Sequence, residues 1–485
     1  MLLTVDIGTS VFKSAVWDFA GNRLAFASAP LSFGLGDGTR HETDGGQWLR
    51  AFGECCIKLG AAVPPASLEA LAICGNGPTL VPVLGGPSVG EGAPSVPAAK
   101  ARLWLDRRAQ EAARLVSAAV GSFVDPGFLL PKALDIKTNE PELYEKTRHF
   151  LGCPELLAYA LTGEAKTVFP SDGFERWFWT GGVLERLGLD GEKFPPFVRP
   201  GEAFGGLAPS AAALFGFRPG IPVISGGPDF IAAILGSGAV RPGQACNRTG
   251  TSDGINACTQ TKVDDGRLMC YGHPVKPFWN LSGIVSTTGR AVEWARDLLG
   301  IESFESFFLL AQTAPAGSGG AVFLPYLAGE RAPVWDPDAR GRMCGLGLST
   351  GRAELARSVL EGINFATRDI LEIMEEAGAP VDELRVAGTA TGSDLANKIK
   401  ADVTGKPVLV PEQKEAELLG LLAIGSCALG RHASFAEAAG ALVRVGRTFE
   451  PARETAKLYE DLFGEYRKMR DGFKGPAGGS QNPPF

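Results

Sequence analysis

Asp229 is the residue of this sequence best placed to act as a base. It follows the apolar run 221–224 and a Gly-Gly-Pro turn, so its carboxylate stands just past the carboxyl end of a predicted strand. Open α/β sheets bind their ligands at that edge. An ionised carboxylate held there can accept a proton from a substrate hydroxyl. Aspartate is also a favoured helix N-cap, and one residue can fill both roles.

Two Gly-Thr-Ser sequences lie roughly 240 residues apart, as in an internally duplicated architecture. Glycine permits a tight turn that brings backbone N–H groups against phosphate oxygens, and the hydroxyls add donors. A lysine further along the first hairpin adds a positive point charge. Two ordinary β-turns explain the tripeptides equally well. The residues expected to hold one polyphosphate are Gly8, Thr9, Ser10 and Lys13 in the first turn and Gly250, Thr251 and Ser252 in the second.

Asp6 ends the apolar run 2–5 and precedes the first of these turns. Its carboxylate would face a phosphate-bound Mg²⁺, a cation that prefers oxygen ligands and keeps several waters. Asp6 and Asp229 are therefore the candidate ligands for Mg²⁺.

A third glycine turn, 388–393, follows a strand and precedes a helix whose N-terminus is available for phosphate or ribose. Neither a dinucleotide-binding fingerprint nor a Gly-Lys-Ser/Thr phosphate loop occurs in the chain.

The composition indicates a folded protein with many turns. Of 485 residues, 64 are glycine and 45% are hydrophobic, and the net charge is −7. That charge argues against general binding of nucleic acid or membrane surfaces, although an anion site built from backbone amides remains compatible with it. The nine cysteines show no zinc-site spacing, and we interpret them as reduced thiols. The chain lacks a signal-like start and any long apolar segment, so we expect a cytoplasmic protein.

Short β-rich runs alternate with helical stretches, which is typical of an α/β fold. The chain is long enough for two domains, with a cleft between them. We expect an N-terminal domain at 1–240, a C-terminal domain at 241–465 and a flexible tail at 466–485. The clearest predicted strands are Leu2–Val5, Val11–Trp17, Leu71–Cys74, Ile221–Ile224 and Leu384–Ala387, and the clearest later helices are Leu395–Val403 and Glu415–Leu429. Small residues of the last helix, Gly420 among them, allow close packing.

Several motifs in order along the chain resemble the FGGY carbohydrate kinases, xylulokinases in particular. They span about residue 2 to about residue 450. They are Asp6-x-Gly-Thr-Ser-x-x-Lys13, Pro131-Lys132 followed by Asn139–Tyr144, Leu161–Glu164, Gly226–Asp229, Leu324–Pro333, Asp336–Gly341 and Ala401–Pro407. The resemblance implies a two-lobed, actin-like and ribonuclease-H-like fold, the use of ATP with Mg²⁺, and phosphorylation of a sugar hydroxyl.

The resemblance also implies roles for individual residues. Asp229 corresponds to the catalytic base and Asp6 to the carboxylate near the metal, while the two Gly-Thr-Ser turns correspond to the phosphate loops. Gly289, Gly388 and Thr389 should line the nucleotide side. Trp104 and Asp106 match a Trp-x-Asp-x-Arg segment near the sugar.

The sugar pocket departs from the family pattern. Xylulokinases carry Gly-Gln-Met-His-Gly where this chain has Gly75, Asn76, Gly77, Pro78 and Thr79. Asn76 and Gly77 are therefore expected to face a larger or differently shaped substrate. Asp135 replaces the usual tryptophan after Pro-Lys, which predicts a more polar wall.

The preferred function is ATP-dependent phosphorylation of a pentulose such as xylulose, or of a related sugar, polyol or sugar acid. A catalytically silent, actin- or chaperone-like nucleotide-binding protein is one alternative, and a sugar-binding regulator is another. Retention of Asp6, Lys13 and Asp229 favours the kinase. The expected partners are the sugar and ATP, with a homodimer as one option. The substrate, the phosphorylated carbon and the regulation are left open.

Overall fold

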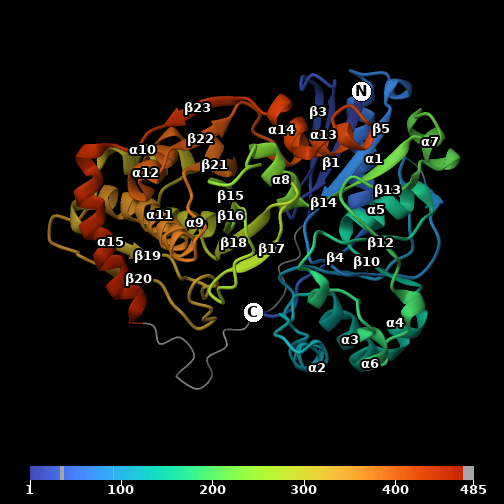
Figure 1. Cartoon of the computed structure of the whole chain (residues 1–485), viewed down its shortest axis with the longest axis horizontal. Coiled ribbons are helices and arrows are strands. Elements are labelled where there is room, and N and C mark those ends of the chain that lie inside the picture. The colour runs from blue at the N-terminus through green and yellow to red at the C-terminus, as the bar shows by residue number, and fades with distance from the viewer. Residues whose placement is uncertain (33–37, 91, 473–485) are drawn as a thin grey trace. The chain divides into compact units, whose positions relative to one another are not determined.

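The computed structural model describes residues 1–32, 38–90 and 92–472 (Figure 1). They form two compact units. Of the described residues, the first contains those within 1–236 and 417–442, and the second contains those within 237–416 and 443–472. Residues 466–471, which the sequence analysis places in the tail, belong to helix α15 (Ala456–Asp471), and residues 473–485 lie outside the described part. The boundary after Val240 stays a prediction.

The first unit is built on one mixed sheet. Within the described residues its strand order is β13-β14-β5-β1-β2-β3. The strands are β1 (Leu2–Ile7), β2 (Val11–Trp17), β3 (Arg23–Pro30), β5 (Ala70–Gly75), β13 (Ala203–Gly206) and β14 (Pro222–Pro228). β1 pairs antiparallel with β2, whereas β1, β5 and β14 run parallel to one another. The carboxyl ends of three parallel strands therefore meet at one edge.

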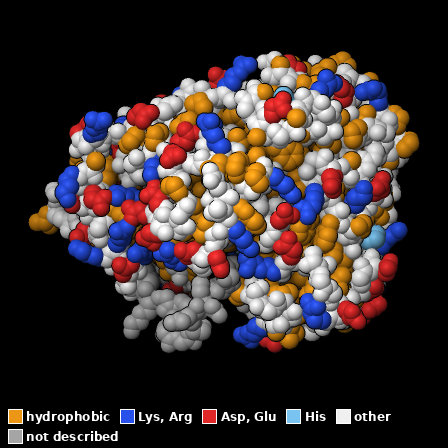
Figure 2. All heavy atoms as spheres, in the orientation of Figure 1, with side chains coloured by type: hydrophobic (Ala, Val, Ile, Leu, Met, Phe, Trp, Pro, Cys, Tyr) orange, Lys and Arg blue, Asp and Glu red, His pale blue; other side chains and the backbone are white. Residues whose placement is uncertain are grey.

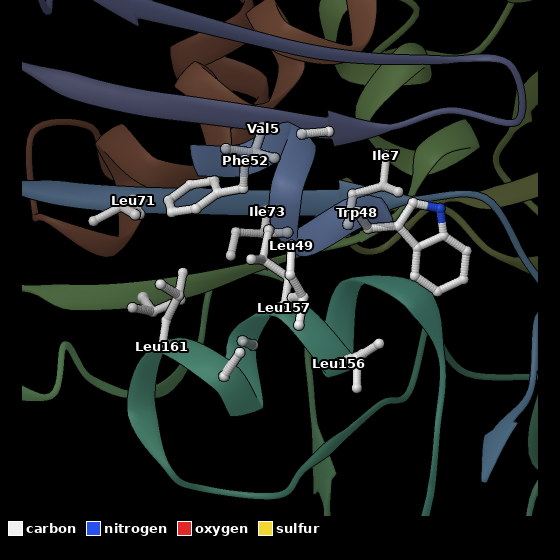
Figure 3. Close-up of a cluster of buried hydrophobic side chains, with 14 of the residues drawn as sticks. Val5, Ile7, Trp48, Leu49, Phe52, Leu71, Ile73, Leu156, Leu157 and Leu161 are labelled. Carbon is white, nitrogen blue, oxygen red and sulfur yellow. The ribbon is translucent and has the colours of Figure 1, made fainter. Parts of the chain in front are cut away.

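Strand β1 is buried on both faces, and its side chains alternate between them. Val5 and Ile7 join the main hydrophobic core, which helices α1 (Gly46–Gly60) and α5 (Cys153–Thr162) cover. Figure 3 shows Trp48 and Phe52 of α1 and Leu156, Leu157 and Leu161 of α5 against the side chains of β1 and β5. Asp6 therefore points to the opposite face.

That opposite face carries helices α8 (Asp229–Ser237) and α13 (Ala416–Ala428). A Cβ atom on Gly425 of α13 would lie 2.5 Å from the side chain of Leu2, and one on Gly420 would lie 1.8 Å from the backbone oxygen of Ala232 in α8. The close packing expected at Gly420 is thus observed. Helix α13 belongs to the first unit although it lies some 180 residues beyond α8.

Smaller elements complete the first unit. The helices are α2 (Gln110–Val120), α3 (Leu129–Asn139), α4 (Pro141–Lys146), α6 (Val183–Arg186), α7 (Pro209–Phe215) and α14 (Phe435–Leu442). The short strands are β4 (Glu42–Thr43), β6 (Val81–Val83), β7 (Ser88–Val89), β8 (Pro94–Ser95), β9 (Ala101–Arg102), β10 (His149–Leu151), β11 (Thr167–Val168) and β12 (Phe197–Val198).

The second unit repeats this topology. Among the described residues its sheet has the order β17-β18-β16-β15-β21-β22-β23. β15 pairs antiparallel with β16 and parallel with β21, as β1 does with β2 and β5. The two Gly-Thr-Ser sequences occupy the equivalent hairpin turns. The strands are β15 (Gln244–Thr249), β16 (Asp253–Thr259), β17 (Met269–Gly272), β18 (Trp279–Val285), β21 (Glu383–Gly388), β22 (Val408–Pro411) and β23 (Val445–Phe449).

Helices α11 (Arg352–Glu376) and α12 (Asp394–Thr404) contact this sheet. Helices α9 (Gly289–Leu298) and α10 (Phe304–Thr313) contact α11, and α15 contacts α11, α12 and β19 (Val322–Leu324). Strands β19 and β20 (Arg342–Cys344) form a small second sheet. The long helix α11 supplies Phe365, Ile370 and Met374 to the core. A Cβ atom on Gly283 of β18 would lie 2.5 Å from Ile370, which shows how closely α11 lies on the strands.

Acidic and basic side chains are interspersed on the face shown in Figure 2. All nine cysteines are free. In the part of the chain that the structure describes, we find no helix with the length and apolar character needed to cross a membrane.

Candidate active site

A first candidate cluster lies within the first unit, at the carboxyl edge of β1, β5 and β14. Ile7 of β1 and Pro228 of β14 are both in register with Gly75 of the central strand β5. Gly8, Asn76 and Asp229 follow these positions directly, so the sheet brings their backbones to one edge. Three segments that are distant in the sequence thereby meet at an edge where α/β sheets bind ligands.

Asp6 and Asp229 lie on either side of Cys74. Asp6 is 4% exposed, and the Cys74 thiol donates to its Oδ1 at 3.5 Å. Burial raises the pKa of the Cys74 thiol well above its usual value, and the negative charges of Asp6, Asp229 and Glu417 raise it further. The charges of three carboxylates of the first unit therefore act on this cysteine. The sequence analysis missed Glu417, which lies at the start of α13.

Asp229 is itself the first residue of α8, so the helix begins one residue earlier than the N-cap interpretation of Asp229 predicts. It is partly exposed, whereas most of the helix behind it is buried. The ring of the next residue, Phe230, stacks on Phe174 with their centroids 6.3 Å apart. Asp229 is thus a partly exposed residue at the start of a helix that is otherwise mostly buried.

The first glycine turn is a tight hairpin. The Gly8 N–H donates to the Val11 oxygen at 3.2 Å, and a Cβ atom on Gly8 would lie 2.6 Å from that same oxygen. Glycine is therefore required by the turn itself. Lys13 lies opposite Asp6 across the β1–β2 pair and is partly exposed.

Asn76 braces this turn. Its Nδ2 donates to the backbone oxygens of Ile7 at 2.9 Å and Gly8 at 3.1 Å, and its Oδ1 accepts from the Thr79 hydroxyl at 2.8 Å. The side chain is 5% exposed. These contacts occupy the amide that the sequence assigns to the substrate. Gly77 is exposed, and an added Cβ atom would have the Thr79 nitrogen at 3.9 Å as its nearest neighbour, so space is available there.

The carboxylate of Asp106 is also bound within the protein. It accepts from Arg108 Nε at 2.9 Å and from the His41 N–H at 2.9 Å, and it is fully buried. Burial alone would raise the pKa of Asp106, but these donors hold it below its ordinary value. Trp104 is partly exposed and donates from Nε1 to the Thr9 hydroxyl at 3.2 Å. Trp104 thus links the sugar-side segment to the first turn.

Lys132 is a further residue of this region. Its buried ammonium donates to the backbone oxygens of Leu103 at 2.7 Å and Pro78 at 2.8 Å, and burial lowers its pKa to about 7. It ties α3 to the 76–79 turn and to the 102–104 segment. The Pro-Lys motif was visible in the sequence, but nothing local indicated which carbonyl groups the lysine binds.

Asp135, expected to make the pocket wall more polar, is paired. Its Oδ2 accepts from Arg102 at 2.6 Å and its Oδ1 from Asn139 at 2.7 Å, and Arg102 also binds Glu140. Arg102 is 2% exposed. Asp135 thus belongs to a buried ion pair, and the more polar pocket wall expected there stays a prediction.

A second candidate cluster lies within the second unit, where three turns meet. Gly289 N–H donates to the Gly250 oxygen at 3.0 Å, and Thr288 N–H donates to the Thr251 oxygen at 3.2 Å. A Cβ atom on Gly289 would lie 2.3 Å from the Gly250 oxygen. The turn between β15 and β16 therefore caps α9 through its own carbonyl groups.

The turn after β21 joins the same cluster. Gly388 has φ +80°, and a Cβ atom there would lie 2.0 Å from the Thr249 oxygen. The Thr249 hydroxyl donates to the Ala387 oxygen at 2.8 Å and accepts from the Ala390 N–H at 2.8 Å. Thr389 and Thr251 are exposed. The structure thus brings together all the nucleotide-side residues expected in this unit.

The carboxylates of the first unit supply the kind of oxygen ligands that Mg²⁺ uses. Within the described residues no group of three or more His, Cys, Asp or Glu side chains is arranged to enclose a metal. Mg²⁺ is commonly bound by one or two carboxylates together with waters and substrate phosphates. Asp6 and Asp229 match that donor set.

Comparisons with known proteins agree with this architecture. Residues 1–236 match the N-terminal domain of the FGGY family of carbohydrate kinases, and residues 245–429 match its C-terminal domain. A xylulose kinase from Staphylococcus epidermidis is 26% identical over 97% of this chain and 96% of its own. A gluconokinase from Bacillus subtilis is 27% identical over 74% of this chain and 75% of its own.

The fold also matches solved structures. The ligand-bound xylulose kinase from Lactobacillus acidophilus superposes with a TM-score of 0.84, at 24% identity, over 97% of this chain and 98% of its own. The actin-like, ribonuclease-H-like fold and the family resemblance expected from the sequence are confirmed.

Proposed function

This chain belongs to the FGGY family of carbohydrate kinases, and we propose that it uses Asp229 to deprotonate the hydroxyl group that receives the phosphoryl group of ATP. It is an ATP-dependent carbohydrate kinase. The proposed acceptor is a pentulose such as xylulose, or a related sugar, polyol or sugar acid.

One observation carries the role of Asp229. The residue opens α8 at the carboxyl end of β14, partly exposed, on the same sheet edge as the turn that follows Asp6. A carboxylate fixed at a helix start keeps its orientation while a substrate hydroxyl approaches, and general-base catalysis depends on that geometry. No other motif residue in the first unit combines a carboxylate, partial exposure and this position.

The proposed nucleotide contacts divide between two turns. Residues 8–10 with Lys13 would supply one set of donors and residues 250–252 the other, and Gly289, Gly388 and Thr389 would line the nucleotide side. Mg²⁺, when bound, would neutralise phosphate charge and orient the transferred group. Asp6 and Asp229 would hold it. Backbone N–H groups preorganised in tight turns stabilise charge that develops during transfer.

The substrate pocket is proposed to differ from that of xylulokinases. The side chains of Asn76 and Asp106 are engaged in bonds to the protein, while Gly77 leaves open space. We therefore expect Asn76 and Asp106 to shape the pocket, and Trp104 and Gly77 to offer surface to the substrate. Xylulose and gluconate kinases both occur among the relatives, which supports testing ketoses and sugar acids together.

The test is ADP release measured with a panel of ketopentoses, polyols and aldonic acids. Asp229→Asn should lower turnover about 10²–10⁴-fold, as expected for loss of a general base, while ATP binding measured by calorimetry stays nearly unchanged. The exposed Asp44→Asn serves as a matched control. Unchanged sugar-dependent ADP release in Asp229→Asn would refute the assignment, and ATP binding without phosphorylation of any acceptor would favour a nucleotide-binding protein.

We further propose that the enzyme acts in the cytoplasm, because a reducing compartment suits nine free thiols. Sugar and ATP are its proposed partners. The homodimer stays a prediction that sedimentation equilibrium can check.

A further inference from the structure

Asp253 is a buried carboxylate directly beneath the second glycine turn. It is the first residue of β16 and 3% exposed. Its Oδ1 accepts from the Thr288 hydroxyl at 2.6 Å and lies 3.4 Å from the Gly250 nitrogen. Thr288 immediately precedes α9. One side chain thus contacts both the turn and the start of the helix.

These contacts add to the backbone bonds between the two segments. Thr288 and Gly289 donate their N–H groups to the carbonyl oxygens of Thr251 and Gly250, and the Thr288 hydroxyl lies 3.2 Å from the Gly250 oxygen. Asp253 joins the same two segments through its side chain, because it contacts both Gly250 and Thr288. The position of the turn therefore depends on the Asp253 carboxylate as well as on the backbone.

The charge of Asp253 is matched by Lys400 of α12. The lysine is 3% exposed and lies 3.9 Å from Asp253 Oδ2, and its ammonium binds Asn247 Oδ1. Asn247 Nδ2 in turn lies 3.5 Å from Asp253 Oδ2. Burial lowers the pKa of Lys400, and the negative charge of Asp253 opposes that effect. Two buried charges of opposite sign stabilise each other, and removal of one leaves the other uncompensated.

Without the positive charge of Lys400, the negative charge of the Asp253 carboxylate would repel the phosphate groups of a nucleotide bound at the turn. Its Oδ1 stands within 3.4 Å of a backbone nitrogen of the turn. We propose that Asp253 is a positioning residue for the nucleotide turn 250–252 and that Lys400 neutralises it so that the turn can accept a polyphosphate. The inference rests on the proposed function, which assigns this turn to ATP. Neither residue was singled out by the sequence.

The charge balance is tested with Lys400→Met, Asp253→Asn and the double variant. Lys400→Met leaves the carboxylate alone and should weaken ATP binding about tenfold and raise the KM for ATP in parallel, with the KM for the sugar unchanged. Asp253→Asn retains an oxygen acceptor for Thr288 and should weaken ATP binding less. The double variant carries neither charge and should return ATP affinity to within about threefold of wild type.

The positioning role is tested separately at Thr288. Thr288→Val removes the hydroxyl bond to Asp253 and should raise the KM for ATP about tenfold, while Thr288→Ser should behave as wild type. Thr367→Val removes a buried hydroxyl that donates to the Ile363 oxygen of its own helix α11, in the same unit, and controls for loss of stability alone. It should lower the melting temperature without changing either KM.

Wild-type ATP affinity in a folded Lys400→Met protein would overturn the charge role, as would a double variant no better than Lys400→Met. If Lys400→Met does not fold, a tenfold loss of affinity in the uncharged double variant overturns it. Wild-type KM for ATP in Thr288→Val overturns the positioning role. Calorimetry with ATP alone keeps these outcomes separate from the proposed function, which fails only if no acceptor is phosphorylated.

Discussion

Glu330 is a carboxylate held inside the second unit. It is 4% exposed, and its Oε1 accepts from the N–H groups of Ser286 and Arg331, each at 2.8 Å. Burial raises the pKa of Glu330 to about 7, and these donors only partly oppose the effect. Ser286 leads into the segment that starts α9. The residue thus supports the segment before α9, which we propose lines the nucleotide, at some cost in stability.

The sign of its pH dependence follows from linkage. Between about pH 4.5 and 7 the folded state keeps a proton on Glu330 that the unfolded state has lost, so its contribution to stability falls as pH rises through this range. Glu330→Gln can accept the same two bonds without a charge. It should raise the free energy of unfolding at pH 8, by an amount on the order of 3 kcal/mol at about 1.4 kcal/mol per pKa unit, and change it little at pH 5.

Denaturant titrations at the two pH values check this prediction. The exposed Glu305→Gln of α10 serves as the control. Equal effects of Glu330→Gln at pH 5 and pH 8 would show that the buried carboxylate does not titrate in this range.

At the scale of elements, the sequence predicts what depends on local pattern. The apolar runs 2–5, 71–74 and 384–387 are parts of β1, β5 and β21, and the run 11–17 is β2 with the same bounds. The predicted helices 395–403 and 415–429 match α12 and α13 within two residues at each end. Buried parallel strands have short, continuous apolar sequences, and glycine is common in the turns that adjoin them.

Contacts between distant segments could not be predicted in this way. The amide of Asn76 looks like a sugar ligand beside its neighbours in the chain, yet it binds the carbonyl groups of Ile7 and Gly8. Asp253 and Lys400 lie 147 positions apart, as their numbers show, and no periodicity relates them. Such pairs follow from the topology of the sheets, which a single sequence does not reveal.

The junction of α9 with the second turn gives a prediction at this scale. Gly289→Ala places a Cβ atom 2.3 Å from the Gly250 oxygen, so either the turn or the helix start must move. ATP affinity should fall about tenfold, equivalent to about 1.4 kcal/mol. Calorimetry measures it directly.

Gly464→Ala in α15 is the matched control, because its added Cβ atom meets nothing within 4 Å. It should leave ATP affinity unchanged and stabilise the helix slightly. ATP affinity of Gly289→Ala equal to that of wild type would mean that the turn adjusts without consequence for the nucleotide.

At the scale of the whole molecule, the first unit is assembled from two separate stretches of chain. Helix α13 packs through Gly420 on Ala232 of α8, the helix that begins with Asp229. No local signal in the sequence assigns residues 417–442 to the first unit, since a helix with buried small residues could pack against either sheet. The structure shows that the helix packs in the first unit.

Gly420→Ala should therefore destabilise the protein by about 1–3 kcal/mol, because the new Cβ atom would lie 1.8 Å from a backbone oxygen. Gly440→Ala in α14 of the same segment has open space and should instead stabilise by about 0.5–1 kcal/mol. Melting temperatures compare the two. Similar shifts for both variants would contradict the close packing of α13 on α8.

This division of the first unit also sets the order of events during synthesis. Residues 1–236 leave the ribosome first, and the second unit up to residue 416 follows before α13 emerges. Until then the surfaces of Leu2, Gly226 and Ala232 that α13 contacts stay uncovered, and α8 lacks its packing partner. Because domains complete their folding as units, the aspartate at the start of α8 gains its final support only when most of the chain exists. A growing chain therefore carries a first unit without α13 until residues 416–428 of that helix have been synthesised.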